Sequence, residues 1–215
     1  MALYNAAGFK SFNLEEQQNA TKQIYYFKIA DLPGGDTLKL AVIVAKGIED
    51  GPTLVALGGV HGDEYEGPYA VRLTYENLNP IAMKGTYIGV PVCNVPAFAA
   101  GLRVSPLDGL NLARIFPGNE SGTVTERIAY NLGEYVISGS DFLIDLHSSG
   151  AGTSIPPLIG YYANNSPLGQ QSLDAARAFG MPVMWGHPSL GSGRTISYAH
   201  EKGIPWLYTE SVGGG

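Results

Sequence analysis

The hydrophobic pattern of the chain predicts strands that alternate with helices. Two apolar segments, 24–30 and 38–47, flank the turn sequence DLPGGD and are expected to form a hairpin whose loop is longer than two residues. The run PTLVALGGV (52–60) is continuously apolar, which is typical of a strand buried on both faces. The segment 85–95 has the same character. Shorter strands are expected at 141–147, 182–186 and 205–210.

Three helices are expected between these strands. The first begins near Pro68, which suits the first position of a helix, and its apolar stripe contains Val71, Tyr75 and Leu78. The second, 123–138, opens with the capping box TVTE. The third follows Ser166 and Pro167 and closes at Gly180.

This alternation predicts an α/β fold, with three layers (α/β/α) around a mixed, mostly parallel central sheet. The opening hairpin is the reason to expect a mixed sheet. We find no internal repeat, low-complexity tract or linker, so residues 1–215 are expected to form a single domain. In such sheets ligands bind beyond the carboxyl ends of the strands, where the polar motifs of this chain occur.

The composition and charge of the 215-residue chain narrow its classes of partner. It is 45% hydrophobic and 15% charged, as in ordinary globular proteins. A net charge of −6 argues against nucleic acid or an anionic membrane as the main partner. No apolar run approaches membrane-spanning length, and the stretch MALYNAAGFKSF lacks the pattern of a signal peptide. Because Cys93 is the one cysteine, no internal disulfide can form and a cytoplasmic location is favoured.

A short spacing of metal-ligand residue types follows the strand 52–60, where GGVHGDEYEGP contains His61 and Glu64. A catalytic zinc needs three protein ligands, commonly two a short step apart and a third far along the chain. His147, which ends the strand 141–147, is the candidate third ligand. By itself, H-x-x-E also begins many exposed helices. Three other donors are poorer, because they are alone or expected in loop or helix contexts: Cys93, His187 and His200.

Two acidic residues also stand at strand ends. Asp145 is two residues before His147 and therefore on the same side of the strand, where it could accept a hydrogen bond from either histidine of the candidate site. It could equally bond to nearby backbone. Glu210, between an apolar strand and a run of glycines, could take a proton from a metal-bound water or could simply cap a loop.

The segment GLRVSPLDGLNLARIFPG (101–118) places Arg103 and Arg114 on either side of a turn-rich loop. Arginine presents a planar, permanently charged group that suits a carboxylate or a developing oxyanion, although surface arginines are common. Asp108 and Asn111 are expected to shape the loop as turn formers.

Taken in order, these motifs resemble the succinylglutamate desuccinylase/aspartoacylase family, zinc deacylases related to the zinc carboxypeptidases. The matching pieces, over roughly residues 52 to 212, are GGVHGDE, NVPAF, PLDGLNLARIFPG, TERIA, DLHSSG and TES. The resemblance implies a zinc carboxypeptidase-like fold and one Zn2+ per chain. It also implies a small-molecule substrate.

The resemblance assigns roles to residues at the matching positions. Glu210 would be the general base, and Arg103 would polarise the acyl oxygen. Arg114 would hold the substrate's carboxylate, and we group Asn111 with it as a substrate-binding residue. The zinc ligands would be His61, Glu64 and His147, with Asp145 behind a histidine ligand.

Two features depart from the family pattern. Ala113 stands in NLAR where relatives usually have an asparagine that assists the arginine, so carboxylate binding is expected to be weaker or differently aimed. The sequence also stops five residues after Glu210, where relatives continue into a region that helps to enclose the substrate. The chain is therefore expected to be a catalytic domain without that region: a fragment, a shortened version, or a protein completed by another chain.

The function predicted on these grounds is a zinc-dependent amidohydrolase that removes the acyl group from an N-acyl amino acid or similar small amide. Two alternatives stay open, a metallocarboxypeptidase that acts on peptides and an inactive or partial zinc domain that needs a partner chain. Homo-oligomerisation is also expected, because a missing region would leave apolar surface exposed. The sequence does not identify the acyl group or the amine.

Overall fold

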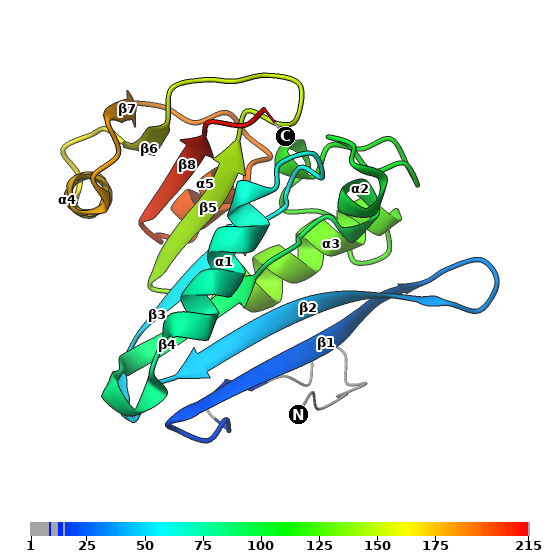
Figure 1. Ribbon diagram of the computed structural model, residues 1–215, viewed down its shortest axis with the longest axis horizontal. Helices are drawn as coiled ribbons and strands as arrows, with labels where there is room; N and C mark the ends of the chain where they lie inside the picture. Colours follow the sequence, from blue (N-terminus) through cyan, green and yellow to red (C-terminus); the bar gives the residue numbers. More distant parts are fainter. Residues whose placement is uncertain (1–8, 10–12, 15, 215) are drawn as a thin grey trace.

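Figure 1 shows the computed structural model of the chain, which describes residues 9, 13–14 and 16–214. Within these residues the strands form one sheet in the order β1-β2-β4-β3-β5-β8-β6-β7. The strands are β1 (Thr21–Asp31), β2 (Thr37–Lys46), β3 (Glu49–Gly58), β4 (Lys84–Val90), β5 (Phe142–Ser148), β6 (Leu158–Tyr162), β7 (Val183–His187) and β8 (Trp206–Ser211). The helices are α1 (Glu66–Asn77), α2 (Val95–Ala100), α3 (Val124–Leu132), α4 (Pro167–Phe179) and α5 (Thr195–Glu201), with short turns η2 (Pro80–Ala82), η3 (Leu112–Arg114) and η4 (Gly133–Ile137).

The sheet is mixed and mostly parallel, as predicted. The opening hairpin β1–β2 is antiparallel, and its loop of residues 32–36 is longer than two residues. Strand β4 pairs antiparallel with β2, whereas β4, β3, β5 and β8 are parallel neighbours. Strand β6 is antiparallel to β8 and parallel to β7 at the far edge. The central strand β3 has fully buried side chains such as Val55 and Leu57, in agreement with its continuous apolar run.

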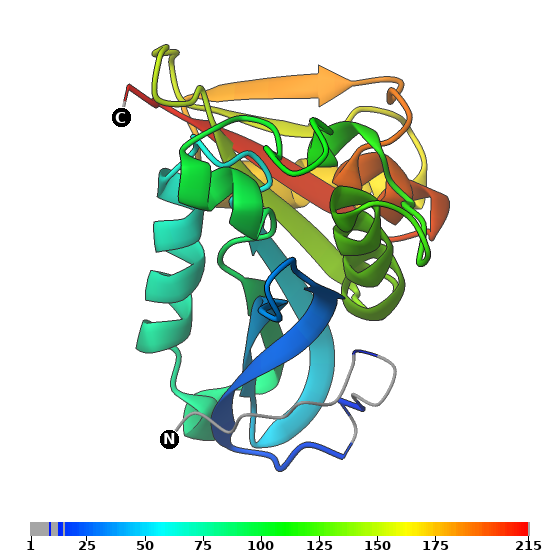
Figure 2. The ribbon, with the colours of Figure 1, turned by 90° about the vertical axis from the view of Figure 1, so that its right-hand side faces the viewer.

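Helices cover both faces of the sheet and complete the three layers (Figures 1 and 2). On one face, α1 packs over β3, β4 and β5, and α4 packs over β6 and β8. On the other face, α3 and α5 enclose the largest hydrophobic cluster, which includes Ile128, Leu132, Leu143, Ala199 and Trp206. Asp145 and Glu210 point to this second face, because they share the strand alternation of Leu143 and Trp206.

The capping residues in the sequence correctly predict the ends of two helices. Thr123 and Glu126 form the predicted capping box, and the helix continues through the π-helical turn η4 to Ile137. Ser166 Oγ accepts a hydrogen bond from Gly169 N at 3.2 Å, and Gly180 ends α4 in a left-handed conformation.

Three predicted boundaries are wrong. The strand expected over 85–95 ends at Val90, because the chain turns at Pro91 and Asn94 then caps α2. Helix α1 begins at Glu66, two residues before Pro68, which the first turn tolerates because its N–H groups have no partner within the helix. His187, expected in a loop or helix context, is the last residue of strand β7.

No helix in the described residues is long and apolar enough to cross a membrane. The N-terminal stretch in which the sequence lacks a signal-peptide pattern lies, apart from Phe9, outside the described residues. Cys93 is buried and free. A cytoplasmic location and self-association stay predictions.

Candidate active site

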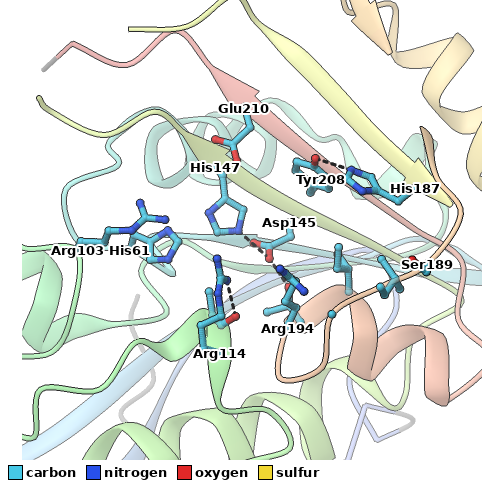
Figure 3. A pocket seen from close by; sticks show the side chains of 15 residues that line it. His61, Arg103, Arg114, Asp145, His147, His187, Ser189, Arg194, Tyr208 and Glu210 are labelled. Atoms are coloured by element: carbon cyan, nitrogen blue, oxygen red, sulfur yellow. Dashed lines mark hydrogen bonds and ion pairs between the residues drawn. The ribbon is translucent and has the colours of Figure 1, made fainter. Parts of the chain in front are cut away.

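Three potential metal ligands meet at the carboxyl ends of β3 and β5, and Figure 3 shows two of them, His61 and His147. His61 and Glu64 lie in the loop after β3, and His147 is near the end of β5. His61 Nδ1 is 2.7 Å from Glu64 Oε1, and His147 Nδ1 is 2.8 Å from Glu64 Oε2. All three side chains are buried, and their potential ligand atoms lie within 4.8 Å of one another. The structure thus brings together the residues that the sequence suggested as zinc ligands.

The loop that carries His61 and Glu64 lies directly against α2. A β-carbon at Gly62 would be 2.0 Å from the carbonyl carbon of Ala97, so the close approach requires glycine. Gly62 N also donates to Leu102 O at 3.0 Å. The backbone between the two candidate ligands is therefore fixed by its neighbours.

The hydrogen bonds behind both imidazoles fit a cation at the centre of the cluster. His147 Nε2 is 3.0 Å from Asp145 Oδ2, and His61 Nε2 is 3.1 Å from Asn111 Oδ1. These oxygens can accept the Nε2 proton of each ring. A cation that replaces the Nδ1–H contacts with Glu64 would then meet the Nδ1 lone pair of each neutral ring. Two imidazole nitrogens and one carboxylate form a donor set found in catalytic zinc sites.

The buried negative charge of the site also fits a bound cation. Glu64 and Asp145 are each 2% exposed. Burial tends to raise the pKa of Glu64, but hydrogen bonds from His147 and His61 outweigh it and hold this pKa well below its usual range. Burial also tends to lower the pKa of His147, whereas Asp145 and Glu64 raise it well above its ordinary value. Buried carboxylates require positive charge nearby, which a bound metal ion can supply.

Glu210 lies beside this cluster, on β8, where it is paired in register with His147 of β5. Its side chain lines a cavity of about 300 Å³ whose wall also contains His61 and His147. Burial raises the pKa of Glu210 to about 7; Glu64 and Asp145 add to this rise, whereas His147 and Arg103 oppose it. A carboxyl group with these surroundings can both accept and donate a proton near neutral pH.

Three arginines line the same cavity, Arg103, Arg114 and Arg194 (Figure 3). Arg103 Nη1 donates to Glu64 Oε1 at 3.0 Å. Burial lowers the pKa of Arg114, and the charges of Arg194 and Arg103 lower it further. Phe116 N donates to Gly193 O at 3.0 Å, which fastens the loop before α5 to the segment that carries Arg114. Positive charges grouped in this way suit an anionic ligand.

The two polar residues between Arg103 and Arg114 have different surroundings. The carboxylate of Asp108 accepts hydrogen bonds from Leu110 N at 3.2 Å and from Thr125 N at 2.8 Å, so it shapes the loop as predicted. Asn111 Oδ1 accepts from Ala113 N at 3.0 Å and also faces His61. Asn111 thus lies behind a candidate metal ligand and is not among the side chains that line the cavity.

The family resemblance suggested by the order of the motifs was compared with sequence models of known families. Residues 50–213 match the sequence model of the succinylglutamate desuccinylase/aspartoacylase catalytic domain. The chain belongs to this family. The predicted family and fold class are both confirmed, and members of the family are hydrolases of the deacylating type.

A curated relative of the family is longer than this chain. The N-alpha-acetyl-L-2,4-diaminobutyric acid deacetylase of Halomonas elongata is 38% identical over 168 residues, which are 77% of this chain and 49% of that protein. The chain therefore spans about half the length of this curated relative.

Solved structures of the family share the fold. The succinylglutamate desuccinylase/aspartoacylase of Rhodobacter sphaeroides has a TM-score of 0.84 and 30% identity, over 94% of this chain and 61% of that one. The product-bound ectoine utilization protein EutE (DoeB) of Ruegeria pomeroyi has a TM-score of 0.84 and 29% identity, over 93% and 65% of the two chains.

Sequence reasoning missed several side chains that this family member brings to the cavity. Arg194, Tyr208 and His187 all line it, and Tyr208 Oη is 2.8 Å from His187 Nε2. Burial and the charge of Arg194 lower the pKa of His187, and burial raises the pKa of Tyr208 to about 12. Position is the one sequence signal for two of them, because His187 ends strand β7 and Arg194 directly precedes α5, whereas Tyr208 lies within strand β8.

The contact between Tyr208 and His187 depends on Gly160 of β6, which is paired in register with Tyr208. A β-carbon at position 160 would be 1.8 Å from a ring carbon of Tyr208. We expect Gly160→Ala to displace the ring and to lower the free energy of unfolding by about 1–3 kcal/mol. Denaturant unfolding measures this change. Gly139→Ala is the control, because a β-carbon there has no atom within 4 Å; equal stability of the two variants would contradict the prediction.

Proposed function

We propose that residues 1–215 form a single catalytic domain, a zinc-dependent amidohydrolase that removes the acyl group from an N-acyl amino acid or similar small amide. The observation that carries the proposal is the buried cluster of His61, Glu64 and His147, whose two histidines line a cavity together with Glu210 and three arginines. The diaminobutyric acid deacetylase named above supports this substrate class, since its name specifies an N-acetyl amino acid.

His61, Glu64 and His147 would hold the zinc ion, with Asp145 and Asn111 holding the two imidazole rings from behind. Bound zinc lowers the pKa of its water towards about 7 and polarises the carbonyl group of the substrate. The buried carboxylate and imidazole groups of the cluster would keep the zinc ion attached during turnover.

Glu210 would act as the general base. One of its carboxylate oxygens accepts a proton from the attacking water, and the same oxygen then passes this proton to the leaving nitrogen. The amine therefore departs neutral. The half-buried position of Glu210 in the cavity wall, paired with His147 in the sheet, supports this role.

The arginines would bind the anionic parts of the substrate. Arg103, in contact with Glu64, is close enough to the cluster to stabilise negative charge that develops on the acyl oxygen. Arg114 and Arg194 would hold the carboxylate of the amino acid. Ala113 also lines the cavity, so no amide assists at that position and the second arginine supplies the additional contact.

The test is metal analysis followed by hydrolysis assays on the purified chain. We expect about one zinc per chain and release of acetate or succinate from N-acetyl or N-succinyl derivatives of aspartate, glutamate or diaminobutyrate. Release of free amino acids from the carboxyl end of peptides would instead identify a metallocarboxypeptidase. Bound zinc without hydrolysis of any amide would overturn the proposal for this chain in favour of a partial zinc domain.

A further inference from the structure

The carboxylate of Asp145 is held by two donors at a single oxygen. Its Oδ2 accepts a hydrogen bond from the hydroxyl group of Thr195 and faces His147 Nε2 at 3.0 Å. Asp145 and Thr195 are each 2% exposed, so water does not replace either contact easily. Asp145 Oδ1 has no hydrogen-bond partner among the described residues. The position of this carboxylate therefore depends on the two donors at Oδ2.

We propose that Thr195 is a positioning residue for the metal centre, which it orients through Asp145 and His147. The inference rests on the proposed function, because it assumes that His147 is a metal ligand. A carboxylate with one donor can turn about its side-chain bonds, whereas a second donor at the same oxygen restricts its direction. The fixed oxygen in turn fixes the plane of the His147 ring and so the direction of Nδ1.

Thr195 also connects this centre to the anion-binding side of the cavity. It is the first residue of α5 and follows Arg194 directly. Arg194 N donates to Ser197 Oγ at 2.9 Å, which holds the backbone at the start of this helix. The bond from Thr195 to Asp145 fastens the same backbone to β5 and so contributes to the placement of Arg194 relative to His147.

The alternative is a purely structural role, and Thr125 offers a matched comparison. It is also a buried threonine in the first turn of a helix, and its hydroxyl donates to Asp108 Oδ1 at 2.7 Å. Among the described residues, this aspartate makes no hydrogen bond or ion pair with the His61–Glu64–His147 cluster. Loss of either hydroxyl should reduce stability, but only the loss at Thr195 should reduce metal affinity.

The experiment measures the zinc dissociation constant of the full chain by competition with a chromogenic chelator. Thr195→Val is expected to weaken zinc binding by about 10–100-fold. Thr195→Ser keeps a hydroxyl group, so its zinc dissociation constant should lie within about threefold of the parent value. The zinc dissociation constant of Thr125→Val should equal that of the parent. The melting temperature of each zinc-free variant records stability separately; if Thr195→Val does not fold, Thr195→Ala is measured in its place.

Unchanged affinity in Thr195→Val, or affinity as weak in Thr195→Ser as in Thr195→Val, would overturn the inference. An equal loss in Thr125→Val would do the same, since it would trace the effect to general stability. Absence of zinc binding by the parent chain would overturn the proposed function instead, so the two failures are distinct.

Discussion

Glu210→Gln is expected to slow amide hydrolysis by about 10²–10⁴-fold while zinc binding is retained. The amide of glutamine has nearly the shape of the carboxylate but cannot accept the proton of the attacking water. Glu210 lies outside the cluster of three candidate ligands, so its replacement leaves every ligand atom in place. Turnover of an N-acyl amino acid and zinc content are measured on the same sample.

Glu66→Gln is the matched control for this prediction. Glu66 lies in the first turn of α1 and its Oε1 accepts a hydrogen bond from Gly213 N at 2.9 Å, a contact that a glutamine oxygen can keep. It does not line the cavity. We expect activity within a few-fold of the parent chain. If Glu210→Gln retained a rate similar to that of Glu66→Gln, Glu210 would not be the base.

His61→Ala is expected to abolish stable zinc binding and, with it, hydrolysis. The variant keeps two protein ligands, one fewer than catalytic zinc sites use. It also removes a hydrogen bond from the buried carboxylate of Glu64, which should lower the free energy of unfolding by about 1–3 kcal/mol. Zinc per chain after dialysis is the direct measurement.

His187→Ala controls for the loss of any histidine from this cavity. His187 lines the same wall, but its Nε2 faces the hydroxyl group of Tyr208 rather than Glu64. We expect this variant to keep about one zinc per chain. Equal zinc contents in the two variants would show that His61 is not a ligand.

The centre of the sheet could be predicted because its strands are marked by local sequence. The apolar run at 52–60 and the segment that ends on His147 need no knowledge of distant residues, since strands buried on both faces are continuously hydrophobic. The capping residues Thr123 and Ser166 likewise act within one helical turn. Family resemblance then joined these local signals into a candidate site.

The edge of the sheet was harder to predict. Strand β6 has the short sequence LIGYY. Helix α5 begins at Thr195 and has Arg194 at its N-cap position, where serine, threonine, asparagine or aspartate would be the usual signal. Long-range pairing decides that β8 lies between β5 and β6, and this order brings Tyr208 next to His187. Local sequence patterns do not determine which strands pair, so the contact of Tyr208 with His187 cannot be predicted from them.

For Asp145, residue spacing predicts the face of the strand but not the hydrogen-bond partner. Its position two residues before His147 indicates the same face of the strand, but either histidine could have been its partner. In the structure Asp145 contacts His147, and Asn111 lies behind His61. The loop sequence does not reveal which way the Asn111 side chain turns, so its role in substrate binding stays a prediction.

The candidate metal ligands and another part of the cavity wall come from different regions of the sheet, and this separation has an evolutionary consequence. The candidate metal ligands follow the central strands β3 and β5, which are enclosed by neighbours on both sides. Another part of the cavity wall comes from His187 at the end of β7, the edge strand of the sheet, and from the segment before α5. Substitutions accumulate more readily where fewer neighbours constrain them. Descendants of such an enzyme can therefore acquire new substrates by changing one wall while the inherited metal chemistry stays intact.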